Sequence, residues 1–270
     1  MTKPSFHSGP AYKFISSQSF KLILENESIW FTRGDCFNDP FEANPYMVPI
    51  DWKNLVKEDK SNIKIIKHIA NEAFMRISSK IYTTCFSQTY LDVKSHLMWS
   101  HYADSHRGLC FEVNFPEPSH ENYQKGDLVP IDVKYCKSLF DERQKMTMES
   151  PDLPLYMTTV KSDIWEYENE VRLILHSEVF DKNKFSLVNE NKNANVVFNI
   201  EEITKVIFGS KSSPEDIESI VKLFCKKGHL PEFYRIDLNP ITLEFFEYRL
   251  TIKDEILQYN EQVKKINKES

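Results

Sequence analysis

The sequence predicts an α+β protein in which a curved mixed or antiparallel sheet is flanked by helices. Short segments rich in β-branched and aromatic residues alternate with amphipathic segments along the chain. The 19 Phe, 12 Tyr and 4 Trp can fill a large core, and only 6 Gly exclude a collagen-like design. The 270 residues suit a single strand-rich domain over 1–250, followed by a charged helix or tail over 251–270.

Strand and helix signals alternate in the first half of the chain. We expect strands at 11–16, 28–32, 81–87 and 108–115, and helices at 17–27, 61–79 and 96–105. In the helix at 17–27, Phe20, Ile23 and Leu24 share one face. The helix at 61–79 is predicted from apolar residues at helical spacing: Ile63, Ile66, Ile69, Ala73, Phe74 and Ile77. Two prolines predict an ordered loop over 36–45.

The second half is also mixed. We expect strands at 130–136, 170–176, 196–200, 205–208, 233–238 and 241–248, the first pairing with the strand at 108–115. Residues 138–163 are predicted as helix, interrupted at Pro151 and Pro154. A further helix has clear limits, because Ser213 is a good N-cap and Gly228 a good C-terminal stop. The preceding glycine, Gly209, lacks P-loop spacing, so the segment 209–213 is read as a cap.

Charge and cysteine content argue against several classes of protein. The 34 Lys and Arg against 40 Asp and Glu give a net charge of −6, so general attraction to nucleic acid or to an anionic membrane is not expected. The 5 cysteines include no CxxC pair, and the sequence has neither a secretion signal at its start nor a long apolar run. We expect a cytoplasmic protein that does not bind a membrane.

Polar residues in the loop at 36–45 form the first candidate site. Asn38, Asp39 and Glu42 lie in a turn that Pro40 stiffens, so their oxygens can face a ligand. The alternative is an Asx-turn that binds the loop to itself, with Phe41 as an apolar plug.

The second candidate site lies between Ser87 and Gly108. On a helix, Trp99, Tyr102 and His106 share a face that can stack a planar ring, while His101 and Arg107 can hold a phosphate. Metal binding by the histidines is a weaker hypothesis because their spacing is poor. The alternative is that Trp99 and Tyr102 are core residues.

The third candidate site is the segment 165–172. In an extended strand alternate residues share a face, so one side carries three carboxylates and a guanidinium: Glu166, Glu168, Glu170 and Arg172. The opposite side carries Trp165, Tyr167 and Asn169. Carboxylates this close repel one another unless they face water, a cation or a ligand. The alternative is a solvated edge strand with an ion pair, but the apolar run that follows favours a functional site.

Four ordered motifs resemble the bacterial domain-of-unknown-function family 2971. They are FNDPFE at 37–42, CFS at 85–87, MWSHYADSHRGLCFEV at 98–113, and Lys161 followed by WEYENEVRL at 165–173. The stretch KVIFGSKSSPEDIESI also suits the family, so that the resemblance covers about residues 11–250.

A more distant resemblance is to the ADP-ribosyltransferase-like superfamily, whose order of polar strand, helix, Thr/Ser strand, aromatic helix and Glu-bearing strand is similar. It implies that fold, with NAD as substrate. The resemblance implies that Lys13, beside Tyr12, contacts the adenosine side of NAD, although His or Arg is usual at this position. The nicotinamide would meet Thr84, Ser87 and Tyr102, and the catalytic carboxylate would be Glu170 or Glu168. The remaining expected NAD-binding residues are Asn38, Asp39, Trp99, His101, Arg107, Trp165 and Arg172.

This assignment makes chemical sense because cleavage of the nicotinamide–ribose bond develops positive charge that a carboxylate stabilises. Lys13, Arg107 or Arg172 can meet the pyrophosphate, and no metal is required. We therefore expect an NAD-consuming transferase or glycohydrolase that serves as a bacterial toxin or anti-phage effector. Its acceptor would be a protein or nucleic acid, and the resemblance allows for a neutralising or regulatory partner protein.

Two alternatives stay open. A metal-dependent nuclease could bind Mg²⁺ through Asp39, Glu42, Glu168 and Glu170, with Lys161 near the phosphate, although no D…ExK spacing lies on an apolar strand. A non-catalytic binding module could use the aromatic helix and the FNDPFE loop as a partner groove.

Overall fold

A computed structural model describes residues 5–37, 39, 42, 47, 63–118, 127–143, 145, 147, 153–253 and 256–257. Its residues group into two compact units. The first unit comprises Met1–Gly9, Ile29–Cys85 and Phe115–Val197, and the second comprises Pro10–Ser28, Phe86–Asn114 and Phe198–Ser270. Both contain strands and helices, which confirms the α+β class. The single domain predicted over 1–250 stays a prediction.

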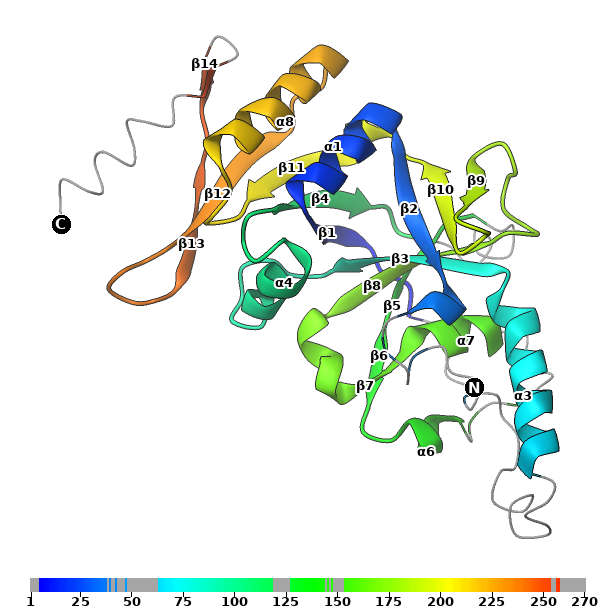
Figure 1. Ribbon diagram of the computed structural model, residues 1–270. Coiled ribbons are helices and arrows are strands. Elements are labelled where there is room, and N and C mark those ends of the chain that lie inside the picture. Colours follow the sequence, from blue (N-terminus) through cyan, green and yellow to red (C-terminus); the bar gives the residue numbers. More distant parts are fainter. Residues whose placement is uncertain are drawn as a thin grey trace. The chain divides into compact units, whose positions relative to one another are not determined.

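The second unit is a mixed sheet with helices (Figure 1). Its strands are β1 (Gly9–Ile15), β4 (Leu109–Phe115), β11 (Ile203–Phe208), β12 (Glu232–Leu238) and β13 (Phe245–Arg249), in the order β13-β12-β11-β4-β1. β11 runs parallel to β12, whereas β4 and β13 are antiparallel to their partners. Its helices are α1 (Ser17–Asn26), α4 (Ser95–Tyr102), α8 (Pro214–Lys227) and the 3₁₀ helix η5 (Ile200–Glu202). A small hairpin, β14 (Ile252–Lys253) and β15 (Ile256–Leu257), follows.

Helices α1 and α8 lie side by side and share an aromatic core with the sheet (Figure 1). The ring of Phe20 lies 5.1 Å from that of Phe111 and 6.0 Å from that of Phe224. At the surface, Lys21 pairs with Asp216 at 2.7 Å. Both helices begin as the sequence predicts, because the side chain of Ser213 accepts a hydrogen bond from the Asp216 N–H and Ser16 caps α1 in the same way.

A tight turn between α4 and β4 is bound to the segment 209–212. The Lys211 N–H donates to the His106 carbonyl at 3.0 Å, and the Gly209 N–H donates to the Gly108 carbonyl at 2.9 Å. The Ser212 hydroxyl lies 3.0 Å from the Arg107 carbonyl and 2.7 Å from the Gly108 carbonyl. These hydrogen bonds join the backbone of two sequence motifs, HRG at 106–108 and GSKS at 209–212.

The first unit contains the remaining elements. Its strands are β2 (Ser28–Arg33), β3 (Ile81–Ser87, to Cys85), β5 (Pro130–Asp132), β6 (Lys134–Cys136), β7 (Val160–Ser162), β8 (Glu170–His176), β9 (Phe185–Val188) and β10 (Asn193–Val197). Its helices are η1 (Gly34–Cys36), α3 (Ile63–Ser78), α6 (Leu139–Arg143), α7 (Leu153–Thr159) and η4 (Asp163–Glu168). β5 pairs antiparallel with β8, and β6 pairs parallel with β7.

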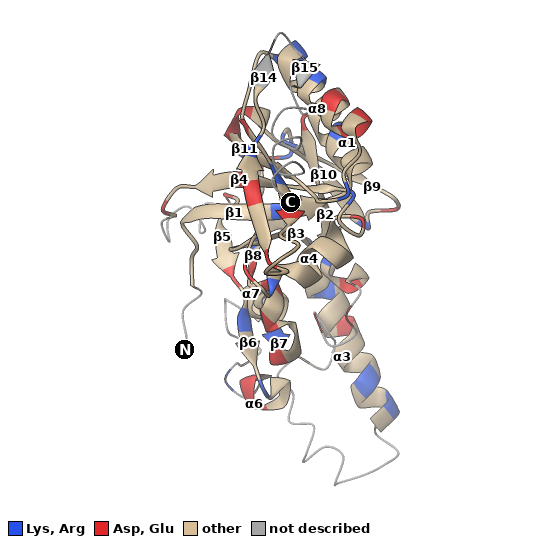
Figure 2. Cartoon of the chain, turned by 90° about the vertical axis from the view of Figure 1, so that its left-hand side faces the viewer, with Lys and Arg blue, Asp and Glu red and all other residues tan. Residues whose placement is uncertain are grey.

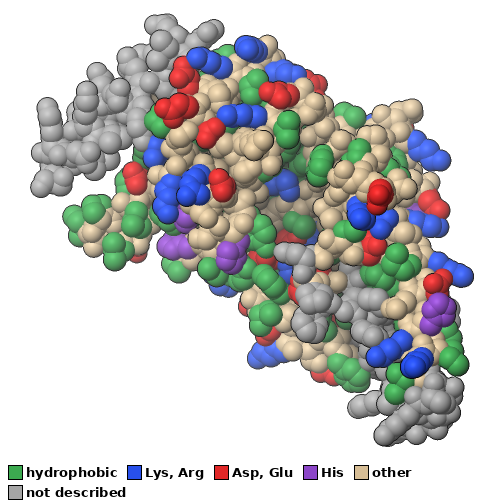
Figure 3. Space-filling model, in the orientation of Figure 1, with side chains coloured by type: hydrophobic (Ala, Val, Ile, Leu, Met, Phe, Trp, Pro, Cys, Tyr) green, Lys and Arg blue, Asp and Glu red, His purple; other side chains and the backbone are tan. Residues whose placement is uncertain are grey.

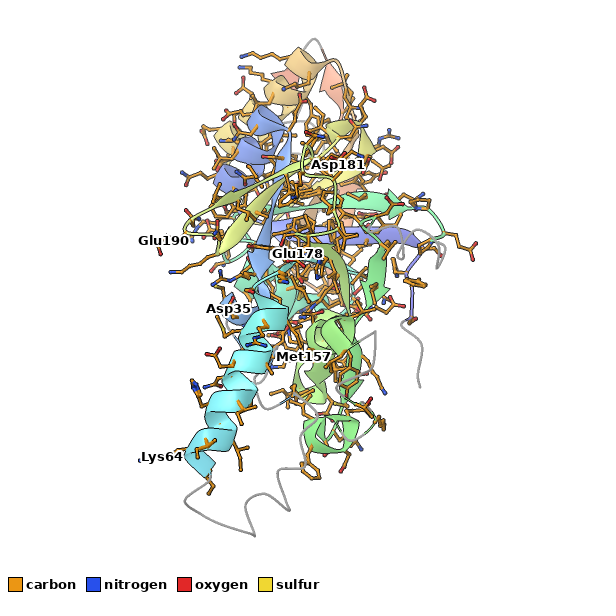
Figure 4. The ribbon with its side chains drawn as sticks, turned by 90° about the vertical axis from the view of Figure 1, so that its right-hand side faces the viewer. Asp35, Lys64, Met157, Glu178, Asp181 and Glu190 are labelled. Carbon is orange, nitrogen blue, oxygen red and sulfur yellow. The ribbon has the colours of Figure 1, made fainter. Side chains whose placement is uncertain are left out.

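An apolar core joins α3 and α7 in this unit. Phe74 of α3 packs with Leu153 and Met157 of α7, and Met157 lies inward in Figure 4 whereas Lys64 lies at the outer end of α3. The buried face of α3 runs through Ile66, Ala70 and Phe74, so the predicted face was partly wrong: Ile69 is exposed.

Five further predictions of secondary structure were wrong in part. The strand predicted at 196–200 is β10, which ends at Val197, followed by η5. The strand predicted at 241–248 begins only at Phe245, after a turn in which Leu243 has φ 58°.

The strand predicted at 130–136 is two short strands that pair with β8 and β7, not with β4. The interrupted helix predicted over 138–163 is α6 and α7, but it ends in β7. Pro154 does not interrupt it, because this residue lies in the first turn of α7, where proline is tolerated; Pro151 lies outside the described residues. The helix at 96–105 ends at Tyr102. The predicted tail lies almost wholly outside the described residues. No helix in the described ranges has the length and apolar character to cross a membrane.

We predict that Gly108→Ala destabilises the protein far more than Gly228→Ala. A Cβ at Gly108 would lie 2.2 Å from the Ile15 carbonyl oxygen and 3.0 Å from that of Ala103, so backbone atoms would have to move. We expect a loss of about 2–3 kcal/mol in the free energy of unfolding. Gly228 has φ +73° but open space around it, so Ala there should cost about 1 kcal/mol. Urea unfolding measures both, and an equal loss would contradict the close-approach argument.

Candidate functional site

Five charged side chains are buried together in the first unit: Glu42, Lys161, Glu168, Glu170 and Arg172. We call them the charge cluster. Glu42 comes from the FNDPFE motif, Lys161 from β7, Glu168 from the end of η4, and Glu170 and Arg172 from β8. Figure 2 shows charged positions of both signs around β7 and β8. The cluster therefore unites the first and third candidate sites of the sequence.

Arg172 is held on several sides. Its Nε donates to Glu170 Oε1 at 2.9 Å and its Nη2 to Glu170 Oε2 at 2.8 Å, a bidentate pair. Its guanidinium also pairs with Glu42 and donates to the backbone carbonyl of Thr158. The ring of Phe37 lies 5.3 Å from the guanidinium carbon. Only 2% of Arg172 is exposed, so this pairing replaces hydration that the charge has lost.

Lys161 lies between three carboxylates. Its Nζ is 2.5 Å from Glu168, 3.3 Å from Glu42 and 3.4 Å from Glu170. It also lies 5.0 Å from the centre of the half-buried Trp165 ring, a cation–π distance. An ammonium thus lies between three of the four carboxylates that the nuclease alternative assigns to Mg²⁺. Within the described ranges, no group of three or more His, Cys, Asp or Glu side chains is arranged to hold a metal.

Glu170 stabilises the charged forms of Lys161 and Arg172, and each of these stabilises the charged form of Glu170. Burial alone would raise the pKa of Glu170, but Arg172 and then Lys161 outweigh it and lower this pKa to about 2. Burial would lower the pKa of Lys161 and of Arg172, but the carboxylates, Glu170 foremost, raise both above their ordinary values. A thiol hydrogen bond from Cys85 further favours the Glu170 carboxylate.

The five side chains are three carboxyl groups, one ammonium and one guanidinium. Tyr135 also contacts the cluster. Its hydroxyl accepts a hydrogen bond from the Glu170 N–H at 2.9 Å, and burial, followed by the charge of Glu170, raises the Tyr135 pKa.

The strand alternation predicted for residues 165–172 was wrong, although three of the four side chains that it placed on one face do lie together. Residues up to Glu168 form the 3₁₀ helix η4, so the strand begins only at Glu170. Glu166 is therefore exposed while Glu168, Glu170 and Arg172 converge. The alternative of a solvated edge strand is also wrong, because all three side chains are buried. Two other predicted residues, Asp39 and Thr84, are buried in the same unit, and Asn38 lies outside the described residues.

The remaining predicted residues belong to the second unit. Tyr12 is buried with its ring 4.5 Å from that of Tyr90, and burial and then Glu112 raise its pKa. Lys13 Nζ lies 5.3 Å from the centre of the Phe86 ring. Ser87 is buried and accepts a hydrogen bond from the Thr89 N–H at 3.4 Å. Their NAD-binding roles stay predictions.

The aromatic face predicted for α4 does not extend to His106, because α4 ends at Tyr102. Asp104, Ser105 and His106 all have positive φ, and this turn stacks the His106 ring on Trp99 at 6.3 Å. Trp99 has no exposed surface and donates its indole N–H to the Tyr90 carbonyl, which agrees with the alternative that it is a core residue.

The other members of this candidate site lie nearer the surface. His101, Tyr102 and Arg107 are exposed. Histidines gather near α4 in Figure 3, where the rings of His96 and His106 lie 4.4 and 5.4 Å from that of Phe245.

Sequence reasoning missed a second polar group, on the sheet of the second unit. Lys205 Nζ lies 2.9 Å from Glu247, 2.6 Å from the Tyr90 hydroxyl and 4.0 Å from the centre of the Tyr234 ring. The single local signal is a lysine inside the apolar strand ITKVIF. Its ammonium binds β13 and the segment before α4 to β11, which is a structural role.

The family model described as "Protein of unknown function (DUF2971)" matches residues 98–173, which supports the resemblance to that family. This stretch includes Lys161, Glu168, Glu170 and Arg172 but not Glu42. No curated protein matches the chain. No solved structure matches it either.

We predict that Glu170→Gln changes how stability depends on pH. The pKa of Glu170 is about 2 in the folded chain against an ordinary 4.5, so its carboxylate stabilises the fold above pH 4.5 and this stabilisation is lost as the pH falls towards 2. The difference corresponds to about 3 kcal/mol. Removing the charge leaves Arg172 poorly paired, so stability at pH 7 should fall by about 3–5 kcal/mol.

Urea unfolding over a pH series measures both effects. The variant should lose less stability than the wild type between pH 4.5 and pH 2. The matched control is Glu166→Gln, on the exposed side of η4, which should leave the profile unchanged. The same acid dependence in Glu170→Gln and in the wild type would show that Glu170 is not the group responsible.

Proposed function

We propose that the protein is an NAD-consuming, ADP-ribosyltransferase-like enzyme whose catalytic carboxylates belong to the charge cluster. The observation that carries this proposal is a buried group in which three glutamates, Glu42, Glu168 and Glu170, converge on the Lys161 ammonium, with Arg172 beside them. Such a group favours a positively charged ligand or a reaction that develops positive charge.

The cleavage of NAD fits this requirement. The nicotinamide ring of oxidised NAD carries a positive charge. When the bond between C1′ and the ring nitrogen breaks, its electron pair goes to the nitrogen, nicotinamide leaves neutral, and positive charge moves to the ribose. A carboxylate held ionised beside C1′ stabilises this oxocarbenium-like state. The acceptor nucleophile then bonds to C1′ and releases its proton.

The surroundings of the carboxylates suit this ligand. Trp165 is half-buried beside Lys161 and can stack a planar nicotinamide ring, and Lys161 holds the Glu168 carboxylate at 2.5 Å. Either Glu168 or Glu170 can stabilise the ribose. The acceptor that we propose is a protein or nucleic acid, and the proposed biological role is that of a toxin or defence effector.

We expect the purified chain to release nicotinamide from NAD. Glu168→Gln or Glu170→Gln should lower the rate by about 10²–10³-fold, the usual cost of losing one preorganised electrostatic partner. The carboxylate whose loss lowers kcat more at equal folded fraction is the catalytic one. Chromatography of the reaction products measures the release.

The control for this assay is Glu166→Gln, which changes an exposed carboxylate of the same 3₁₀ helix and should keep wild-type activity. A thermal shift with NAD tests binding without an acceptor. If the wild type neither releases nicotinamide nor shows a thermal shift with NAD, the proposal is wrong.

The nuclease remains the second candidate, because carboxylates and a lysine do converge in the cluster. The position of Lys161 between the carboxylates disfavours it. DNA cleavage that requires Mg²⁺ and stops with EDTA would support it. For a binding module, Trp99→Ala is a poor test because Trp99 is a core residue; tolerance of substitutions at Glu168 and Glu170 is the better one.

A further inference from the structure

One residue, Asn169, separates the two glutamates of the charge cluster. The 3₁₀ helix η4 ends at Glu168 and β8 begins at Glu170. Asn169 adopts the left-handed conformation, with φ 43° and ψ 55°. The chain therefore changes from helix to strand at a single position, inside the functional site that we propose.

Both sides of this position are fixed by hydrogen bonds. The Asn169 N–H donates to the Glu166 carbonyl at 3.2 Å and closes η4. The Glu170 N–H donates to the Tyr135 hydroxyl, and the Glu170 carbonyl accepts from the Val133 N–H at 2.9 Å. Because its neighbours are held, the backbone angles of Asn169 set the direction of Glu168 relative to Glu170.

The other common backbone conformations would separate the two carboxylates. A right-handed helical residue would continue η4 and take Glu170 out of its strand. An extended residue would continue β8 backwards and turn η4 away. Only the left-handed turn brings Glu168 to 2.5 Å and Glu170 to 3.4 Å from the same Lys161 ammonium.

Side-chain chemistry limits which residues can make this turn. The left-handed region is accessible to Gly and is tolerated by Asn, but it is strained for other residues and most of all for β-branched ones. We infer that Asn169 is a positioning residue, whose left-handed backbone brings Glu168 and Glu170 together on Lys161. The expected effect of Asn169 on activity rests on the proposed function, whereas its effect on the positions of the two carboxylates does not.

The test compares Asn169→Gly, Asn169→Val and the wild type. Gly keeps access to the left-handed region, so its kcat for nicotinamide release should stay within about threefold of wild type. Val should lower kcat by about 100-fold, with a smaller change in KM, because the carboxylates are misplaced while other binding surfaces stay. If Val prevents folding, which circular dichroism detects, Asn169→Ala replaces it.

A matched control separates positioning from general strain. Asn189 is also an asparagine with positive φ (53°) in the first unit, and it lies in the turn between β9 and β10. Asn189→Val imposes the same kind of backbone strain and should lower the melting temperature, but it should leave kcat unchanged.

Carbon NMR titration of the glutamate carboxyls gives a readout that needs no NAD. In the wild type and in Asn169→Gly, the Glu170 signal should not titrate near its ordinary pKa of 4.5, whereas in Asn169→Val it should move towards that value. If Asn169→Val keeps the wild-type titration, the inference is overturned, whatever the chain does with NAD. A shifted titration in Asn169→Val, together with a wild type that neither releases nicotinamide nor shows a thermal shift with NAD, would support the positioning role and reject the proposed function.

Discussion

The ion pairs that Arg172 makes with Glu42 and Glu170 connect parts of the first unit that are far apart in sequence. Glu42 follows the short helix η1, whereas Glu170 and Arg172 begin β8, and Lys161 adds β7 to the same group. Because these charges are buried, none of them can lose its partner without a large cost in folding free energy. The turn that carries Glu42, the end of η4 and the start of β8 are therefore fixed together. A buried ion pair is weak evidence for stability, since apolar residues would often serve as well.

Much of the fold could be predicted from the sequence where the signal is local. The caps of α8, the buried face of α1 and the whole of β8 follow from residue types within a few positions. Prediction failed where the outcome depends on distant partners. Residues 130–136 read as one strand, but their pairing with β8 and β7 divides them. The sequence predicts a helix over 138–163, but residues 160–162 form the strand β7 because they pair with β6.

In the candidate site, too, local features could be predicted from the sequence and contacts between distant residues could not. The excess of carboxylates at 165–172 and the acidic loop at 36–45 indicated where chemistry could lie, and the structure unites Glu42 with Glu168 and Glu170. The sequence could not predict that Glu166 faces outward, because a strand and a 3₁₀ helix place alternate residues differently. It also could not predict the contact of Tyr135 with Glu170, 35 positions apart. In the aromatic segment, Trp99 looked like a ligand-stacking residue, but apolar side chains of similar pattern also fill cores, and here Phe14 and His106 enclose it.

We propose that the carboxylates of the cluster select a positively charged ligand. Calorimetric titration of the wild-type chain with oxidised and with reduced NAD tests it most directly, because the two differ in the charge of the nicotinamide ring and little in size. We expect oxidised NAD to bind at least about tenfold more tightly than reduced NAD, a difference of about 1.4 kcal/mol. Equal affinity for the two forms, or tighter binding of the reduced form, would contradict it.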